Sequence, residues 1–305
     1  MDPPTQLPAT GFRARYGSPL GLALGLLTAL CGVAVYFKVI LWDPDPSLFS
    51  LVEIWMWDEE ASYGFLIPPL AAYFVWERQY RLRGLPAEGS AWGLALIAVA
   101  LGLFFVGLLG GINYLPRASA VFLLLGGIHW IGGPRWTREL VFPVLFLLLM
   151  IPLPQFALIR IAFPLQVFAA EMAESALYTL GVPILRTGNV IHLAHTQLEV
   201  AQACSGLRSL LALVTTGVVF AYFFGQTTLQ RLIVVGMSIP IAILVNAVRV
   251  AGTGWLAHTF GADVATGFYH TIEGFGMFGI AFVLLACVGF GAVWLLPGPS
   301  TETAG

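Results

Sequence analysis

Three side chains that could together carry out acyl transfer stand near the ends of three apolar segments. Cys204 lies where a short polar stretch gives way to an apolar run, Arg249 lies within the next run, and His270 lies near the start of the last. A cysteine thiolate is a nucleophile, an imidazole can carry a proton, and a guanidinium can stabilise charge that develops on a carbonyl oxygen. These are the parts needed to open a peptide bond through a thioester.

The residues around Cys204 favour the reactive form of its side chain. A helix that begins near Ser205 would place Cys204 at its N-terminal end, where unpaired N–H groups and the helix dipole favour a thiolate. Arg208 follows four residues later on the same helix face and acts in the same direction. An inert cysteine at a helix end is the alternative, and this context alone does not separate the two.

The other candidates also have ordinary explanations. An arginine inside a membrane span is costly and marks a functional site by default, although Arg249 could instead pair with a carboxylate or with backbone carbonyls. His270 alone could be an interfacial histidine, and Glu273 could either orient its ring or be solvated. Arg208 could replace Arg249 as the group that stabilises the anion, and the residues alone do not decide between them.

The composition is that of an all-α polytopic membrane protein. Of the 305 residues 58% are hydrophobic and only 10% are charged, whereas a soluble chain carries about 25% charged residues. The net charge of -2 argues against a nucleic-acid partner. The three cysteines are an odd number, and neither Cys31 nor Cys287 is expected at the depth of Cys204, so we expect no disulfide with it. The sequence indicates no metal, nucleotide or organic cofactor.

The apolar runs predict about eight transmembrane helices within a membrane domain of residues 20–296. A span needs roughly 20 apolar residues, or fewer where flanking side chains snorkel. The runs lie at 20–41, 61–77, 91–110, 117–133, 139–154, 206–225, 232–257 and 268–296. Residues 1–19 are predicted to form a cytoplasmic N-terminal segment and 297–305 a mobile tail. The first run lacks a cleavage site and contains Lys38, so it is interpreted as a retained span.

An amphipathic segment, Gln155–Leu180, separates the fifth and sixth runs and predicts a helix in the membrane interface. After it, Arg186–Asn189 is typical of a turn. Apolar and polar residues then alternate, which favours a small outer-face hairpin across Ala194–Gln197, with an ordered loop as the alternative. The apolar residues of this alternation are Ile191, Leu193, Leu198 and Val200.

The arginines of short loops orient the chain, because such residues mark the cytoplasmic side. Eight spans with the N-terminus inside place every basic loop on that side: the residues are Arg13, Arg15, Arg78, Arg81, Arg83, Arg135, Arg138 and Arg231. In this topology Cys204 and His270 lie at the outer face. Arg249 follows Leu232 by seventeen residues, or ~25 Å of helix, and therefore comes to the same depth.

The segments that carry these residues resemble the exosortase/archaeosortase family of membrane cysteine enzymes. The likeness rests on Ala203–Leu210, Pro240–Val250 and Gly267–Gly274, in this order. Weaker similarity covers Tyr63–Pro69, Phe142–Pro143, Ile151–Pro154 and Gly188–Ile191.

The resemblance implies that Cys204, Arg249 and His270 are catalytic, and we add Ser205, Arg208, Asn246 and Glu273 as supporting residues. A histidine at the third position is similar to the bacterial exosortase branch, in a short form without a fused accessory domain. Tyr63 departs from relatives that carry histidine there, so no catalytic role is assigned to that segment.

The resemblance also implies a substrate and a location. The partners would be secreted proteins with a C-terminal sorting tail, made of a Pro-Glu-Pro-like motif, a membrane helix and a basic cluster. The enzyme would be a multi-pass protein of the bacterial inner membrane, in contact with the lipid bilayer, with its site facing the periplasm. A non-catalytic factor for polysaccharide export or a small-molecule transporter are the alternatives, and a transporter would predict a repeat between the two halves.

Overall fold

The structure, a computed structural model, describes residues 36, 50–157, 160–161, 163–194, 196–199, 206–261 and 268–296. Four helices in this part of the chain are long and apolar enough to cross a membrane: Trp92–Gly110, Tyr114–Met150, Thr228–Phe260 and Gly276–Leu295. The protein is therefore a mainly helical, multi-pass membrane protein. The predicted segments 1–19 and 297–305, and the first predicted span apart from Tyr36, lie outside the described residues. The chain divides into two compact units, Met1–Pro154 and Gln155–Gly305, which are described separately.

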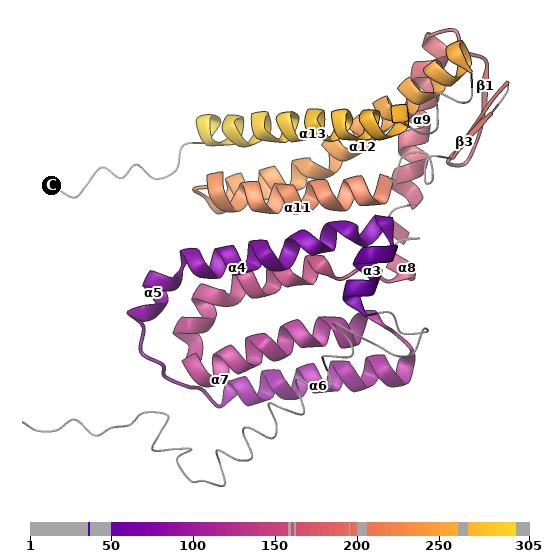
Figure 1. Cartoon of the computed structure of the whole chain (residues 1–305). Helices are drawn as coiled ribbons and strands as arrows, with labels where there is room; N and C mark the ends of the chain where they lie inside the picture. The colour runs from indigo at the N-terminus through magenta and orange to yellow at the C-terminus, as the bar shows by residue number, and fades with distance from the viewer. Residues whose placement is uncertain are drawn as a thin grey trace, which may run out of the picture. The chain divides into compact units, whose positions relative to one another are not determined.

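The described part of the first unit is made of helices (Figure 1). In chain order these are α3 (Leu51–Trp57), the 3-10 helix η1 (Glu59–Leu66), α4 (Ile67–Glu77), α5 (Gln79–Arg83), α6 (Trp92–Gly110), α7 (Tyr114–Phe146) and the 3-10 helix η2 (Leu147–Met150).

Helix α7 folds back on itself at Gly133, as Figure 1 shows. Gly133 has φ 74° and ψ -167°, and a proline follows it at position 134. A Cβ at this position would collide with the carbonyl oxygen of Glu88, so glycine is required by both conformation and space. The predicted run 117–133 thus lies in the first half of α7. The predicted run 139–154 begins within its second half but extends through η2 and past Met150, where residues 151–154 are not helical.

Trp55 connects α3 to the end of the first unit. Its indole is 6% exposed, and Nε1 donates a hydrogen bond of 3.0 Å to the carbonyl oxygen of Met150. Gly64 of η1 lies directly against this indole, and a Cβ on Gly64 would overlap the ring. The absence of a side chain at position 64 therefore allows α3, η1 and η2 to meet.

Substituting Gly64→Ala should destabilise the first unit. The added methyl displaces the indole of Trp55 and breaks its bond to Met150, at a cost of about 2–4 kcal/mol from overpacking and the lost hydrogen bond. Thermal unfolding in detergent measures the effect. Gly127→Ala in α7 is the matched control, because a Cβ there meets nothing within 4 Å. Equal melting temperatures for the two variants would contradict this packing.

The second unit places three long helices side by side. They are α11 (Gly206–Phe224), α12 (Thr228–Phe260) and α13 (Phe268–Leu295), and they pack against one another. Helix α12 begins with a capping box in which Thr227 and Gln230 satisfy each other's backbone N–H groups. Their shared core includes Leu213 of α11, Ala242 and Val245 of α12, and Leu285 of α13.

Before these helices come α8 (Gln155–Ala157) and α9 (Phe163–Thr179), which divide the predicted interfacial segment into two helices. Figure 1 shows α9 running steeply across the end of α12 that lies beside the strands. Three alanines and Leu177 form the buried face of α9, and they pack against Ala247, Val250 and Ala251 of α12.

A small antiparallel sheet covers the same end of the unit. Its strands are β1 (Ile184–Thr187), β2 (Val190–Leu193) and β3 (Gln197–Glu199), in the order β1-β2-β3. Ile191 pairs with Leu198, and both side chains are buried in the core that α9 and α12 share. The strands β2 and β3 thus occupy the segment in which a hairpin or an ordered loop was predicted.

The predicted turn at Arg186–Asn189 is wrong in extent. Arg186 and Thr187 belong to β1, and only Gly188, with φ 65°, and Asn189 form the turn. A strand is recognised in sequence when apolar residues face inward and polar residues face outward. In β1 this order is reversed, because Leu185 is 68% exposed while the Arg186 side chain turns toward α9.

Candidate functional site

The structure describes some of the predicted site residues fully, some by their backbone only, and others not at all. Cys204 and Ser205 lie outside the described residues. The backbone at Arg208, His270 and Glu273 is helical, but their side chains are not described. Arg249 and Asn246 are described fully, on one face of α12. Helix α11 begins at Gly206, directly after the Ser205 at which a helix start was predicted.

Contacts within the bundle fix which residues of α11 and α12 lie at one level. The two helices run antiparallel, and a Cβ on Gly217 of α11 would lie 3.1 Å from the Cβ of Ser238 of α12. Each step back along α11 therefore corresponds to one step forward along α12, since both rise by about 1.5 Å per residue. Eleven steps bring Gly206, the first residue of α11, level with Arg249.

The same reasoning places the start of α13. Helices α11 and α13 run parallel, with aromatic contacts between Phe220 and Phe282 at 5.1 Å and between Phe224 and Phe290 at 5.5 Å. Counting back along α11 from Phe220 and Phe224 to Gly206, and by the same number of residues along α13 from Phe282 and Phe290, reaches positions 268 and 272 of α13. The first turn of α13, which contains His270, is therefore level with the start of α11 and with Arg249.

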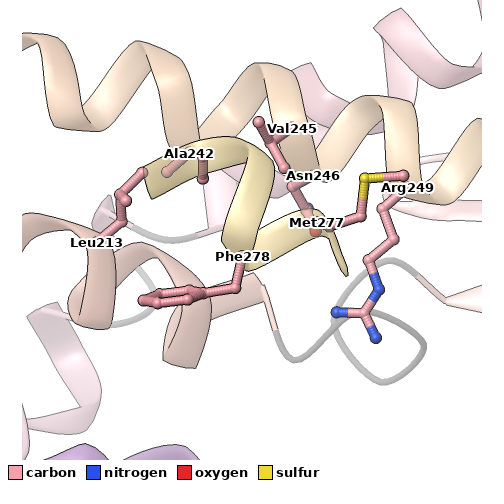
Figure 2. Close-up of a pocket in the computed structure, with 8 residues that line it drawn as sticks. Leu213, Ala242, Val245, Asn246, Arg249, Met277 and Phe278 are labelled. Carbon is pink, nitrogen blue, oxygen red and sulfur yellow. The ribbon is translucent and has the colours of Figure 1, made fainter. Parts of the chain in front are cut away.

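Arg249 is buried at the end of a pocket between these three helices. Its side chain belongs to a residue that is 6% exposed, and its carbonyl oxygen accepts a 3.0 Å hydrogen bond from the hydroxyl of Thr253. The pocket is open on one side and small, with an internal cavity volume of about 20 Å³. Figure 2 shows Arg249 at one end and Leu213 and Ala242 toward the other. The lining residues are Leu213, Ala242, Val245, Asn246, Arg249, Met277, Phe278 and Ala281.

The pocket is apolar except at its Arg249 end. Asn246 precedes Arg249 by one helical turn, so the two polar groups share one face of α12. Because Arg249 is buried, its guanidinium interacts with a negative charge much more strongly than it would in water. The arrangement can therefore hold a peptide group by its oxygen and stabilise charge that develops there.

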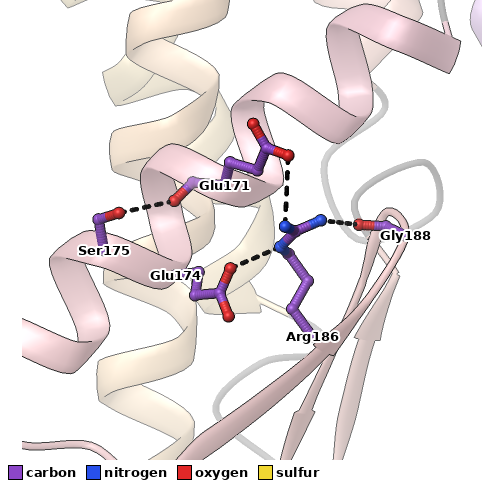
Figure 3. A network of polar contacts seen from close by, with 5 residues as sticks. All are labelled: Glu171, Glu174, Ser175, Arg186 and Gly188. Carbon is purple, nitrogen blue, oxygen red and sulfur yellow. Dashed lines mark hydrogen bonds and ion pairs between the residues drawn. The ribbon is translucent and has the colours of Figure 1, made fainter.

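A network of charged residues fixes the sheet to α9 (Figure 3). Arg186 of β1 donates from Nε to Glu174 at 2.6 Å, from Nη2 to Glu171 at 3.3 Å, and from Nη1 to the carbonyl oxygen of Gly188 at 2.8 Å. The hydrogen bond to Glu174 raises the pKa of Arg186, so this guanidinium stays charged. The network therefore joins β1, and through it the sheet that ends at Glu199 of β3, to α9.

Substituting Arg186→Gln should loosen the sheet without unfolding the protein. The ion pairs are partly exposed, so the loss of global stability should stay at about 1 kcal/mol or less. Amide hydrogen exchange should accelerate in β1 and β2, which open locally. Arg135→Gln serves as the control, because it removes an exposed pair with Glu88 in the other unit. Unchanged exchange in β1 would show that the network does not hold the sheet.

Sequence reasoning missed most of this setting. Glu171 and Glu174 are one turn apart on an amphipathic helix, but nothing in the sequence identifies Arg186 as their partner. The apolar pocket residues of α11 and α13 give no signal either, because they resemble any other core or lipid-facing position. Among the described residues no group of acidic, histidine and cysteine side chains could hold a metal ion.

Comparison with known proteins gives one match. A family model described as transmembrane exosortase matches residues 55–287, which is most of the chain. Neither the curated proteins nor the solved structures gave a match.

Proposed function

The chain belongs to the transmembrane exosortase family, and from this premise we propose that it cleaves secreted proteins at a C-terminal sorting signal with Cys204 as the nucleophile. The family suggests a membrane peptidase or transpeptidase for protein sorting. The observation that carries the proposal is the common level of Arg249 and the first turns of α11 and α13. Cys204 precedes α11 by two residues and His270 lies in the first turn of α13.

The proposed reaction has two steps. The Cys204 thiolate attacks the scissile carbonyl carbon, and the resulting oxyanion is stabilised by Arg249. His270, having taken the thiol proton, returns it to the leaving nitrogen as the carbon–nitrogen bond breaks and a thioester forms. Water or an amine then attacks the thioester carbon, the carbon–sulfur bond breaks, and the thiolate is regenerated.

Arg249 is assigned the oxyanion role because it is buried and lies level with the first turns of α11 and α13. Asn246, one turn away in the same pocket, supports it by binding a neighbouring peptide group. Arg208 lies in the first turn of α11 and is assigned to the stabilisation of the Cys204 thiolate, together with the dipole of that helix. Ser205 and Glu273 are assigned supporting positions around the cysteine and the histidine.

The proposed substrate carries a Pro-Glu-Pro-like motif, a membrane helix and a basic cluster. A substrate helix with its basic end in the cytoplasm would hold the scissile bond at the outer face of the inner membrane. A shared bilayer fixes the depth and orientation of both molecules, which favours a near-attack geometry. The active site would therefore face the periplasm.

Co-expression with a tagged reporter that carries such a tail tests the proposal. Processing should require both the chain and the motif, and a reporter in which the motif is replaced by alanines should remain uncut. A membrane-impermeant maleimide applied to intact spheroplasts should label Cys204. Processing that ignores the motif, or a Cys204 that reacts only after the membrane is permeabilised, would contradict the proposal.

A further inference from the structure

The strand β3 forms one edge of the small sheet. In the order β1-β2-β3 it pairs with β2 on one side, and no strand pairs with its other side among the described residues. An edge strand presents a row of backbone N–H and C=O groups to whatever lies beside it, and an extended peptide can pair with them. The edge of β3 is therefore a place where a second chain can bind through its backbone.

The register of the hairpin shows which groups of β3 point outward. Leu193 donates its N–H to the carbonyl oxygen of Thr196 at 2.8 Å, and β2 and β3 stay in the same register up to Glu199. Hydrogen-bonded and non-hydrogen-bonded pairs alternate in an antiparallel ladder, so Leu198, two residues on, again bonds to β2. Gln197 and Glu199 therefore direct their N–H and C=O groups away from β2, toward the edge.

The two edges of the sheet differ in how well they suit a peptide. Side chains stand above and below a sheet, and in β3 Leu198 is buried in the core while Gln197 is exposed on the opposite face. At the other edge, Pro183 directly precedes β1, and the charged side chain of Arg186 is bound to α9. Proline and charged residues are common means of preventing pairing at an edge. The edge of β3 is thus the better suited of the two.

β3 also lies close to the level of the proposed site. A Cβ on Gly254 of α12 would lie 3.4 Å from Cδ1 of Leu198, so β3 passes beside α12 five residues, or ~8 Å, beyond Arg249. Along the chain, Glu199 precedes Cys204 by five residues, which reach at most about 18 Å when extended. A peptide that pairs with β3 therefore has its paired residues within about five positions of a bond at Cys204.

We propose that the substrate adds to this edge as an extended strand, with the sorting motif paired to Gln197 and Glu199 of β3. This inference rests on the proposed function, from which the Pro-Glu-Pro-like motif is taken. In an added strand of either direction, every second residue turns its N–H and C=O groups toward the edge. Proline has no N–H and fits a sheet only where its nitrogen faces away from the neighbouring strand. A motif with proline at alternate positions, and glutamate facing β3 between them, meets this requirement.

Hydrogen exchange tests the pairing without turnover. The probe is a synthetic tail with a Pro-Glu-Pro motif, a polyleucine helix and a lysine cluster, added at saturation to the full Cys204→Ala chain in lipid nanodiscs. The amides of Gln197 and Glu199 should exchange at least about 10-fold more slowly with the tail, because their hydrogens enter a new ladder. The amides of Ile184 and Arg186, which point outward at the opposite edge by the same alternation, are the matched control and should keep their rates.

Other occupants of the edge give other results. Slow exchange at Gln197 and Glu199 in the absence of any tail would show that another part of the chain already fills the edge. Protection that grows with protein concentration would show that a second copy of the chain pairs there. Either result, or exchange that does not respond to the bound tail, overturns the inference.

The backbone of the substrate provides a second measurement, with the unaltered chain. Methylation of one backbone nitrogen removes one donor and should lower kcat/KM about 3- to 10-fold where that N–H faces β3. The nitrogens that face β3 are those of the motif's glutamate and of the residues two positions before and after it. Methylation three positions from the glutamate should change kcat/KM by less than about twofold. Equal effects at the two sets of positions would contradict pairing at the edge.

A backbone change in β3 complements the substrate series. Gln197→Pro removes one outward N–H and leaves the bonds between β3 and β2, because proline is tolerated at such edge positions. It should lower processing at least about threefold more than Gln197→Ala, which changes the side chain but keeps the N–H. Equal melting temperatures in detergent check that both variants are folded. Equal processing by two folded variants would overturn the inference.

The outcomes separate the two proposals. Processing that survives Cys204→Ala, or a tail that does not bind, contradicts the proposed function and with it this inference. Cys204-dependent processing that shows no alternation along the substrate backbone contradicts only the pairing with β3.

Discussion

Substituting Cys204→Ala should abolish processing of a reporter with the C-terminal tail, by at least about 1,000-fold in rate. The proposed mechanism has no other group that can form the acyl intermediate, and removal of a nucleophile costs several orders of magnitude in enzymes of this kind. The measurement is the rate at which the tag appears on the shortened product in membranes with equal amounts of each variant.

Two further variants make this result specific. Cys204→Ser should also fail, because an alcohol in this place lacks the acidity of a thiol. Cys287→Ser changes an exposed cysteine of α13 and should process the reporter at the unaltered rate. Processing by Cys204→Ala at the normal rate would eliminate the nucleophile and with it the proposed mechanism.

Substituting Arg249→Lys should reduce processing by about 100-fold or more. Loss of one donor to a developing oxyanion typically costs this much, and the ammonium of lysine lacks the planar fork of a guanidinium. Because the site is buried, the remaining charge also cannot move freely to a new position. The reduction should appear in kcat as well as in kcat/KM, since the interaction belongs to the transition state.

Arg231→Lys is the matched control for this change. Arg231 lies near the start of the same helix and donates from Nε to the carbonyl oxygen of Gly225, far along α12 from the pocket. It should alter processing by less than about twofold, as expected for a surface substitution. If Arg249→Lys is as active as Arg231→Lys, a point charge suffices and the fork geometry is not needed.

The long apolar helices could be predicted from sequence because a continuous run of apolar residues is enough to identify each of them. The expected span 232–257 lies within α12, and 268–296 coincides with α13 to within one residue, since few other patterns fit such long apolar runs. The capping box of Thr227 and Gln230 extends α12 by four residues ahead of the predicted start. The fold-back of α7 required a residue pair, Gly133 and Pro134, whose effect depends on the packing of Glu88.

The proposed site could be anticipated only in part from sequence, because the relative levels of the helices that carry it follow from contacts between them. The chemistry of Cys204, Arg249 and His270 is visible in their types and in the ends of the runs that carry them. Their common level can also be expected from span lengths, but the register at Gly217 and Ser238 comes from packing of small residues that no periodicity identifies. Which residues of α13 line the pocket, among them Met277 and Ala281, follows from how the helices are aligned and so could not be predicted either.

The claim on which the account depends is that Cys204 and His270 meet at one level beside Arg249, and a crosslink tests it most directly. In a chain with Cys31→Ser, Cys287→Ser and His270→Cys, a thiol-reactive crosslinker with a two-carbon spacer should join positions 204 and 270 in membranes. A cysteine in place of Gly279, nine residues deeper on α13, should not be joined to Cys204. Efficient crosslinking at 279 with none at 270 would contradict the account.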